Sequence, residues 1–188
     1  MQPTKLVCMG DSLTEAYLVD DSVGWCSLLS KELGIEVINS GISGDTTGGM
    51  LARFQTMVLD HKPSHVIIMG GTNDLSFNLS NQLIFSNIYA MTRLAKYNGI
   101  EPIIGIPVPV YFNGNDDTDG FYLGLKSLSE RMVILQNEMR QMVIEDNFLM
   151  IDFAAGMTEN LFLEDKVHPN EAGHKQMMEN ALKIFGSK

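Results

Sequence analysis

Short apolar segments alternate with longer amphipathic segments along most of this chain. Five of the short runs are rich in Val or Ile and predict β-strands: Lys5–Met9, Glu36–Asn39, His65–Met69, Glu101–Ile106 and Phe148–Ile151. Near-continuous apolar runs of this kind are typical of parallel strands that are covered on both faces.

The longer segments repeat apolar residues every three or four positions, as one face of a helix does. Three such faces are clear: Ile84, Ile88, Met91 and Ala95; Leu128, Met132, Leu135, Met139 and Met142; and Met178, Ala181, Leu182 and Phe185. Alternation of strands and helices predicts a three-layer α/β/α domain with a five-stranded, mostly parallel sheet.

One irregular stretch, residues 107–124, interrupts this alternation with prolines, glycines and acidic residues. A loop of this length in a compact domain is usually functional or disordered. No repeat or linker divides the chain, so we expect one domain over residues 1–188.

The composition limits the classes of partner. The formal net charge is −10, from 13 Lys and Arg against 23 Asp and Glu, and no basic cluster interrupts it. This balance disfavours nucleic acid and anionic membrane surfaces as partners. It leaves the oligomeric state open.

The cysteines and the N-terminus bear on the compartment. Cys8 lies in an apolar run and Cys26 beside Trp25, which predicts two buried thiols rather than a disulfide framework. The apolar stretch before Gly10 is too short for a secretory signal, and no run approaches a membrane span. We therefore expect a cytoplasmic protein without integral membrane contact.

Four short segments together contain the groups that acyl transfer needs: a hydroxyl nucleophile, a base, a carboxylate to orient the base, and donors for an oxyanion. They are Gly10-Asp11-Ser12-Leu13, Gly41-Ile42-Ser43-Gly44-Asp45, Gly71-Thr72-Asn73-Asp74 and Asp165-Lys166-Val167-His168. Three of them directly follow predicted strands and the last follows the fifth strand after a longer loop. In a parallel sheet, ligands bind beyond the carboxyl ends of the strands, so all four are expected at one edge.

Each segment alone also has a purely structural interpretation. Ser12 with Glu15 fits a capping box at a helix N-terminus. Asn73 and Gly44 fit ordinary turns. Pro169 fits the first position of the last helix and leaves His168 in the preceding turn, where it is either a base or a helix-capping residue.

A metal site is a further alternative, with Asp165, His168 and His174 as ligands. His174 is six residues after His168, on the wrong face of a helix to join it, and no Cys or second carboxylate completes the set. We therefore expect no metal.

Together the four segments resemble those of the SGNH hydrolase superfamily, also called GDSL-type esterases and lipases, and in particular small bacterial acylhydrolases of the thioesterase/lysophospholipase type. The resemblance implies a flavodoxin-like fold, a catalytic triad of Ser12, His168 and Asp165, and no cofactor. It also implies an oxyanion hole formed by the Ser12 and Gly44 amides and the Asn73 side chain.

The resulting hypothesis is a serine hydrolase that acts on small ester or thioester substrates through an acyl-enzyme. Asp11 and the aromatic residues of the long loop (Tyr111, Phe112, Phe121 and Tyr122) are weaker substrate-binding candidates. The aromatic residues either line an acyl channel or anchor the loop to the core. Two alternatives stay open: a carbohydrate O-acetyl esterase with the same triad, and a non-catalytic flavodoxin-like module that binds phosphate or flavin.

Overall fold

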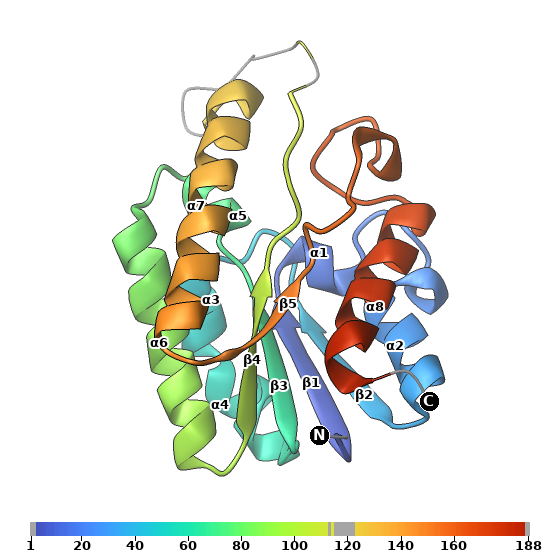
Figure 1. Ribbon diagram of the computed structural model, residues 1–188, viewed down its shortest axis with the longest axis vertical. Helices are drawn as coiled ribbons and strands as arrows, with labels where there is room; N and C mark the ends of the chain where they lie inside the picture. Colours follow the sequence, from blue (N-terminus) through green and yellow to red (C-terminus); the bar gives the residue numbers. More distant parts are fainter. Residues whose placement is uncertain (1–2, 113, 115–122, 187–188) are drawn as a thin grey trace.

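The chain forms a five-stranded sheet between two layers of helices in a computed structural model that describes residues 3–112, 114 and 123–186 (Figure 1). The strands are β1 (Lys5–Gly10), β2 (Glu36–Gly41), β3 (His65–Met69), β4 (Glu101–Ile106) and β5 (Leu149–Asp152). All neighbouring pairs are parallel, in the order β2-β1-β3-β4-β5. The prediction of a parallel five-stranded α/β/α domain is confirmed.

The α-helices are α1 (Ser12–Glu15), α2 (Trp25–Leu33), α3 (Thr47–Ala52), α4 (Phe54–Met57), α5 (Thr72–Ser76), α6 (Asn81–Tyr97), α7 (Leu125–Glu145) and α8 (Glu171–Phe185). Short 3-10 turns are η1 (Asp21–Val23), η2 (Leu59–His61) and η3 (Glu159–Leu161). Helices α6 and α7 lie on one side of the sheet and α2 and α8 on the other (Figure 1). None of the helices in the described ranges is long and apolar enough to cross a membrane.

The strand β1 shows why the sheet is buried on both faces. Successive side chains of a strand point to opposite faces, and here Val7 and Met9 join the core under α6 and α7 while Leu6 and Cys8 join the core under α2 and α8. Four apolar residues in a row are therefore required at this strand.

The predicted helical faces form these two cores. Ile84, Ile88, Met91 and Ala95 of α6 are fully buried. The five predicted positions of α7 are buried as well, and so are Met178, Ala181 and Phe185 of α8. Both cysteines are free and buried, as predicted.

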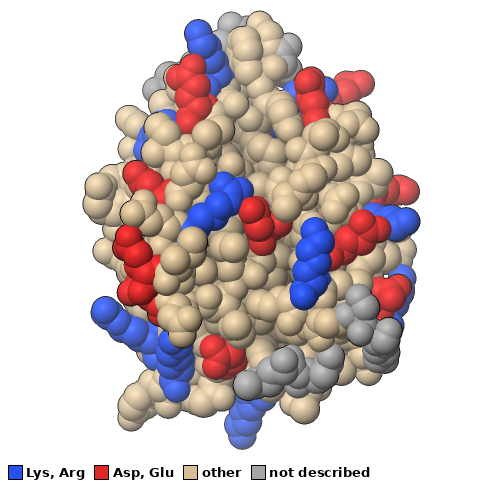
Figure 2. All heavy atoms as spheres, viewed as in Figure 1, with Lys and Arg blue, Asp and Glu red and all other residues tan. Residues whose placement is uncertain are grey.

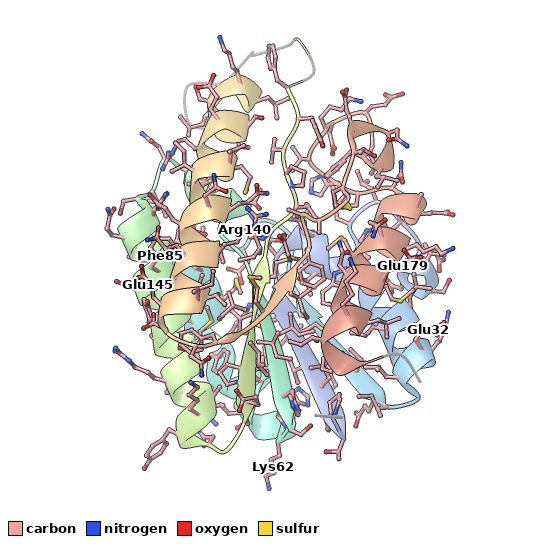
Figure 3. The ribbon with its side chains drawn as sticks, viewed as in Figure 1. Glu32, Lys62, Phe85, Arg140, Glu145 and Glu179 are labelled. Atoms are coloured by element: carbon pink, nitrogen blue, oxygen red, sulfur yellow. The ribbon has the colours of Figure 1, made fainter. Side chains whose placement is uncertain are left out.

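Charged side chains of both signs are interspersed on the face of the molecule that Figure 2 presents. Figure 2 shows Lys and Arg alternating with Asp and Glu across one face, without a large patch of either sign. Of the side chains labelled in Figure 3, Lys62 marks the edge of the sheet at which β3 begins. Arg140 of α7 donates to both carboxylate oxygens of Asp152, at 2.9 and 3.1 Å, and so ties α7 to the carboxyl end of β5 (Figure 3).

Candidate active site

Ser12 lies in the turn that follows β1, at the carboxyl edge of the sheet. It is the first residue of α1, and only 8% of its surface is exposed. The helix is capped by Asp11, whose Oδ1 accepts from the Leu13 N–H at 3.0 Å. The interpretation of Ser12 as the N-cap is therefore wrong, because the residue before it fills that place and leaves the Ser12 hydroxyl free for another partner.

Glu15 does not complete a capping box. Its carboxylate instead accepts from the backbone N–H of Ser43, at 2.6 Å, and from the Ser43 hydroxyl. The first turn of α1 is thereby fastened to the segment after β2 that contains Gly44.

His168 connects Ser12 with Asp165. Its Nε2 lies 3.0 Å from Ser12 Oγ, and its Nδ1 lies 2.6 Å from Asp165 Oδ2. Both distances are within hydrogen-bond reach. The structure thus joins two groups that are 156 positions apart in the sequence.

Asp165 is held by several donors. Its Oδ1 accepts from the backbone N–H groups of Val167 and His168, both at 3.0 Å. Burial raises the pKa of Asp165, but the hydrogen bonds from His168 and Val167 outweigh this effect and leave the pKa lowered from 3.8. The carboxylate is therefore ionised at neutral pH and fixes the tautomer with a proton on Nδ1.

The last helix begins two residues later than Pro169 predicts. Asn170 is its N-cap and accepts from the Gly173 N–H, so α8 starts at Glu171. Pro169 instead pairs with Phe162 in an isolated antiparallel bridge. The prediction that His168 lies in a turn before the helix is confirmed, although Pro169 is not the first helical residue.

Asn73 and Gly44 lie at the same edge. The Asn73 Nδ2 donates to the Asp45 carbonyl at 2.9 Å, which links the turn after β3 to the turn after β2. Gly44 has a φ of +79°, a conformation that favours glycine, and among the described residues no heavy atom lies within 4 Å of the place that a Cβ would take. Its backbone is open to an approaching group.

Similarity to known proteins agrees with this arrangement. Residues 8–176 match the GDSL-like lipase/acylhydrolase family. The chain belongs to this family. Esterase TesA of Pseudomonas aeruginosa is 29% identical over 183 residues, 93% of this chain and 84% of that protein, and the acetylxylan esterase of Geobacillus stearothermophilus is 27% identical over 217 residues, 97% and 94%. A solved structure of a G-D-S-L family protein from Desulfitobacterium hafniense DCB-2 superposes with a TM-score of 0.79 at 28% identity, over 96% of this chain and 99% of that one.

This GDSL-family protein is a carboxylic ester hydrolase, as the resemblance implies. The alternative of a non-catalytic flavodoxin-like module is set aside.

One residue next to His168 was missed by sequence reasoning. The Tyr17 ring lies against the His168 ring, with centroids 4.9 Å apart and planes tilted by 55°. Its neighbours Ala16 and Leu18 both have positive φ, of 73° and 66°. Neither is glycine, so the sequence gives no sign that the backbone turns here to place Tyr17 over the imidazole.

The structure corrects the prediction that Asp11 contacts substrate. Asp11 is fully buried, and its carboxylate oxygens face Leu13 N and Asn73 Nδ2. Burial, with the charges of Asp74 and Asp45 nearby, raises the pKa of Asp11 to about 7 against the opposing bond from Leu13.

A second buried carboxylate supports the same edge. Asp74 accepts from the Thr47 N–H at 2.9 Å and from the Thr47 hydroxyl at 2.6 Å, which joins α5 to α3. Burial raises the pKa of Asp74, although the bonds from Thr47 oppose this.

Arg53 connects the ends of β1 and β2. Its guanidinium donates to the carbonyls of Gly10 and Ser40, both at 2.8 Å, and to the Asp45 carboxylate at 2.6 Å. A single side chain therefore supports the turns that contain Ser12 and Gly44.

The aromatic candidates of the long loop fall into two groups. The Tyr111 hydroxyl donates to the Met157 carbonyl at 2.8 Å, and the ring packs edge-on against Phe162. Tyr111 therefore anchors the loop, as one of the two alternatives held, whereas Phe112 is 43% exposed. Phe121 and Tyr122 lie outside the described residues.

His174, the third ligand of the alternative metal site, is part of the core. Its Nδ1 accepts from the Trp25 N–H at 3.4 Å, and burial lowers its pKa to about 4. Within residues 3–112, 114 and 123–186, no three His, Cys, Asp or Glu side chains are placed to hold a metal ion.

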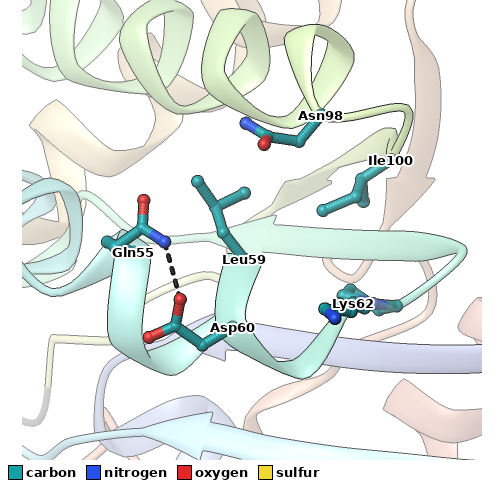
Figure 4. A pocket seen from close by; sticks show the side chains of 7 residues that line it. Gln55, Leu59, Asp60, Lys62, Asn98 and Ile100 are labelled. Carbon is teal, nitrogen blue, oxygen red and sulfur yellow. Dashed lines mark hydrogen bonds between the residues drawn. The ribbon is translucent and has the colours of Figure 1, made fainter.

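A surface hollow lies at the opposite edge of the sheet, where β3 and β4 begin (Figure 4). Leu59 and Ile100 line it, and Gln55 donates to Asp60 at its rim, at 2.6 Å. Because Ser12 and His168 are at the carboxyl edge, this hollow does not belong to the site.

Proposed function

We propose that the enzyme cleaves esters through an acyl-enzyme on Ser12, with His168 as the base and Asp165 as its orienting carboxylate. The observation that carries the proposal is the continuous line of contacts from Asp165 to His168, at 2.6 Å, and from His168 to Ser12 Oγ, at 3.0 Å. Nucleophile, base and orienting group within hydrogen-bond reach are the geometric signature of a serine hydrolase.

In the first half-reaction, His168 Nε2 takes the Ser12 proton while Oγ attacks the ester carbonyl. The resulting oxyanion accepts from the Ser12 and Gly44 amides and from the Asn73 side chain. His168 then gives its proton to the leaving alcohol, and the C–O bond breaks to leave acyl-Ser12.

In the second half-reaction, water takes the place of the alcohol. His168 removes a proton from water, the hydroxide oxygen attacks the acyl carbonyl, and the proton returns to Ser12 Oγ as the carboxylic acid departs. Asp165 stays ionised throughout, consistent with its lowered pKa.

The test is covalent labelling by a fluorophosphonate together with hydrolysis of p-nitrophenyl esters. We expect the probe to label Ser12, and Ser12→Ala to lower kcat on the order of 10⁴-fold or more, because the residues of a triad act as a unit. Labelling at another serine, or activity that survives in Ser12→Ala, would overturn the assignment.

The class of ester that the enzyme prefers can be tested by comparing its rates on different substrates. We propose small esters or thioesters, and the likeness to an acetylxylan esterase keeps carbohydrate O-acetyl esters as a second candidate. Rates on C2 to C12 p-nitrophenyl esters, acyl thioesters and acetylated xylo-oligosaccharides distinguish the two. A kcat/KM for the acetylated sugar above that of every simple ester would favour the second.

A further inference from the structure

The amide group of Asn73 has two acceptors at a single nitrogen. Its Nδ2 lies 2.9 Å from the Asp45 carbonyl and 3.4 Å from Asp11 Oδ2. An amide nitrogen carries two hydrogens and the amide oxygen carries none. Both contacts are favourable only when the NH₂ end of Asn73 faces them, because a flipped amide would set its oxygen against two other oxygens.

Asp11 cannot move away from this contact easily. Its side chain is fully buried, and its other oxygen, Oδ1, accepts from the Leu13 N–H at 3.0 Å. That bond caps α1 and aims Oδ2 at Asn73. The same residue thus fixes the turn that contains Ser12 and faces the side chain assigned to the oxyanion.

We propose that Asp11 is a positioning residue that holds the Asn73 amide with its NH₂ end directed at the reaction site. This inference rests on the proposed function, in which Asn73 donates to the oxyanion. The Asp45 bond is the shorter contact and acts as the pivot. The contact to Asp11 is longer, so the Asn73 N–H that faces Asp11 can turn toward an oxyanion on Ser12.

The substitution Asp11→Asn separates this role from helix capping. Asparagine caps helices about as well as aspartate, so its oxygen keeps the bond from Leu13. In place of Oδ2 it presents a second NH₂ group to Asn73. Two donors facing each other repel, so the Asn73 NH₂ group loses the acceptor at Asp11 and is displaced from its position while the Asp45 carbonyl still opposes a flip.

The experiment measures kcat and KM on p-nitrophenyl acetate for the parent enzyme, Asp11→Asn, Asn73→Ala and the double variant. We expect Asp11→Asn to lower kcat about 10- to 100-fold with KM within about twofold, since one oxyanion donor accounts for roughly 10²- to 10³-fold. In the Asn73→Ala background the same change should have no further effect, because the group through which it acts is gone.

The matched control is Asp20→Asn. Asp20 caps η1 with the same kind of bond, to the Ser22 N–H at 2.9 Å, on the exposed surface. It should leave kcat unchanged. Thermal unfolding of each variant checks folding, and Asp11→Ser, which keeps a capping oxygen but cannot reach Asn73, replaces Asp11→Asn if that variant does not fold.

The outcomes are distinguishable. If Asp11→Asn keeps the parent kcat, or lowers kcat by the same factor with and without Asn73, the positioning role is overturned while fluorophosphonate labelling of Ser12 leaves the proposed function standing. If the parent enzyme neither labels at Ser12 nor hydrolyses the ester, the proposed function fails and this inference fails with it.

Discussion

The environment of individual residues at the carboxyl edge differs from what their types suggest. Asp11 is a charged residue with no exposed surface, whereas Tyr17 is an aromatic residue that is 44% exposed. The Ser12 carbonyl accepts from the N–H groups of both Ala16 and Tyr17, at 3.2 and 3.1 Å. Ser12 and the Tyr17 ring beside the His168 imidazole therefore belong to one short turn.

The contact between the Tyr17 and His168 rings can be tested by substitution of Tyr17. Removing its ring by Tyr17→Ala leaves His168 without one of its packing partners, and an aromatic contact of this kind contributes about 0.5–1.5 kcal/mol. We expect kcat/KM on p-nitrophenyl acetate to fall roughly 2- to 12-fold. Tyr17→Phe keeps the ring and should retain the parent value. An equal loss in both variants would show that the hydroxyl, and not the ring contact, is required.

Elements place the site through close backbone contacts. A Cβ on Gly41, the last residue of β2, would lie 2.2 Å from Glu15 N and 2.8 Å from the Asp11 carbonyl. These are backbone atoms of α1 and its cap, so no side-chain movement relieves the clash. The absence of a side chain at Gly41 lets α1 rest on the end of β2.

Gly41→Ala should therefore disturb both stability and catalysis. Overpacking of this kind costs roughly 1–3 kcal/mol of unfolding free energy, and moving α1 also moves Ser12 away from His168. The control is Gly105→Ala in β4, where a Cβ would meet the side chains of Met69 and Phe153. Urea unfolding should show destabilisation in both variants, with kcat reduced only in Gly41→Ala. A parent-like kcat in Gly41→Ala would contradict this view of α1.

The same elements show how far sequence reasoning reaches. Strands and helical faces were predicted because apolar periodicity reports burial directly, as at Val7 or Ile88. The meeting of Ser12 and His168 was predicted because the carboxyl ends of parallel strands lie at one edge, and their catalytic roles stay a prediction. Three details were missed or misplaced. The position of Tyr17 depends on left-handed backbone at Ala16 and Leu18. The cap role of Asp11 and the start of α8 depend on which of two neighbouring residues begins the helix, Asp11 or Ser12 for α1 and Asn170 or Pro169 for α8.

At the scale of the whole molecule, the core under α2 and α8 contains a titratable group. His174 of α8 is 1% exposed and accepts from the first residue of α2. Burial first, and then the charge of His168, lower its pKa from 6.5 to about 4. At neutral pH, His174 is therefore uncharged and packed in the core of the folded protein.

Stability should depend on pH through this residue. Between pH 6.5 and 4 the unfolded chain binds a proton at His174 that the folded chain does not, so stability is present above pH 6.5 and is lost as pH falls toward 4, by up to about 3 kcal/mol. Asp11, whose pKa is raised, contributes in the opposite sense over pH 4 to 7. The two effects are separated by comparing variants.

We expect His174→Asn, which keeps an acceptor near Trp25 N, to be less stable at pH 7 but to lose less stability on acidification than the parent. Urea unfolding at pH 7, 6, 5 and 4 measures this difference. His61→Asn, at a half-exposed position, should follow the parent curve. Parallel curves for parent and His174→Asn would rule the histidine out as the source.

The contact between Ser12 and His168 spans nearly the whole chain, and this has a consequence for how the enzyme becomes active. His168 lies on the segment that precedes α8, and α8 packs onto α2 and β5. If that segment undocks while the five strands stay paired, Ser12 loses its contact with His168 at once. We therefore expect hydrolytic activity to depend on the docking of α8. As denaturant is increased gradually, activity should be lost before circular dichroism shows the loss of the sheet.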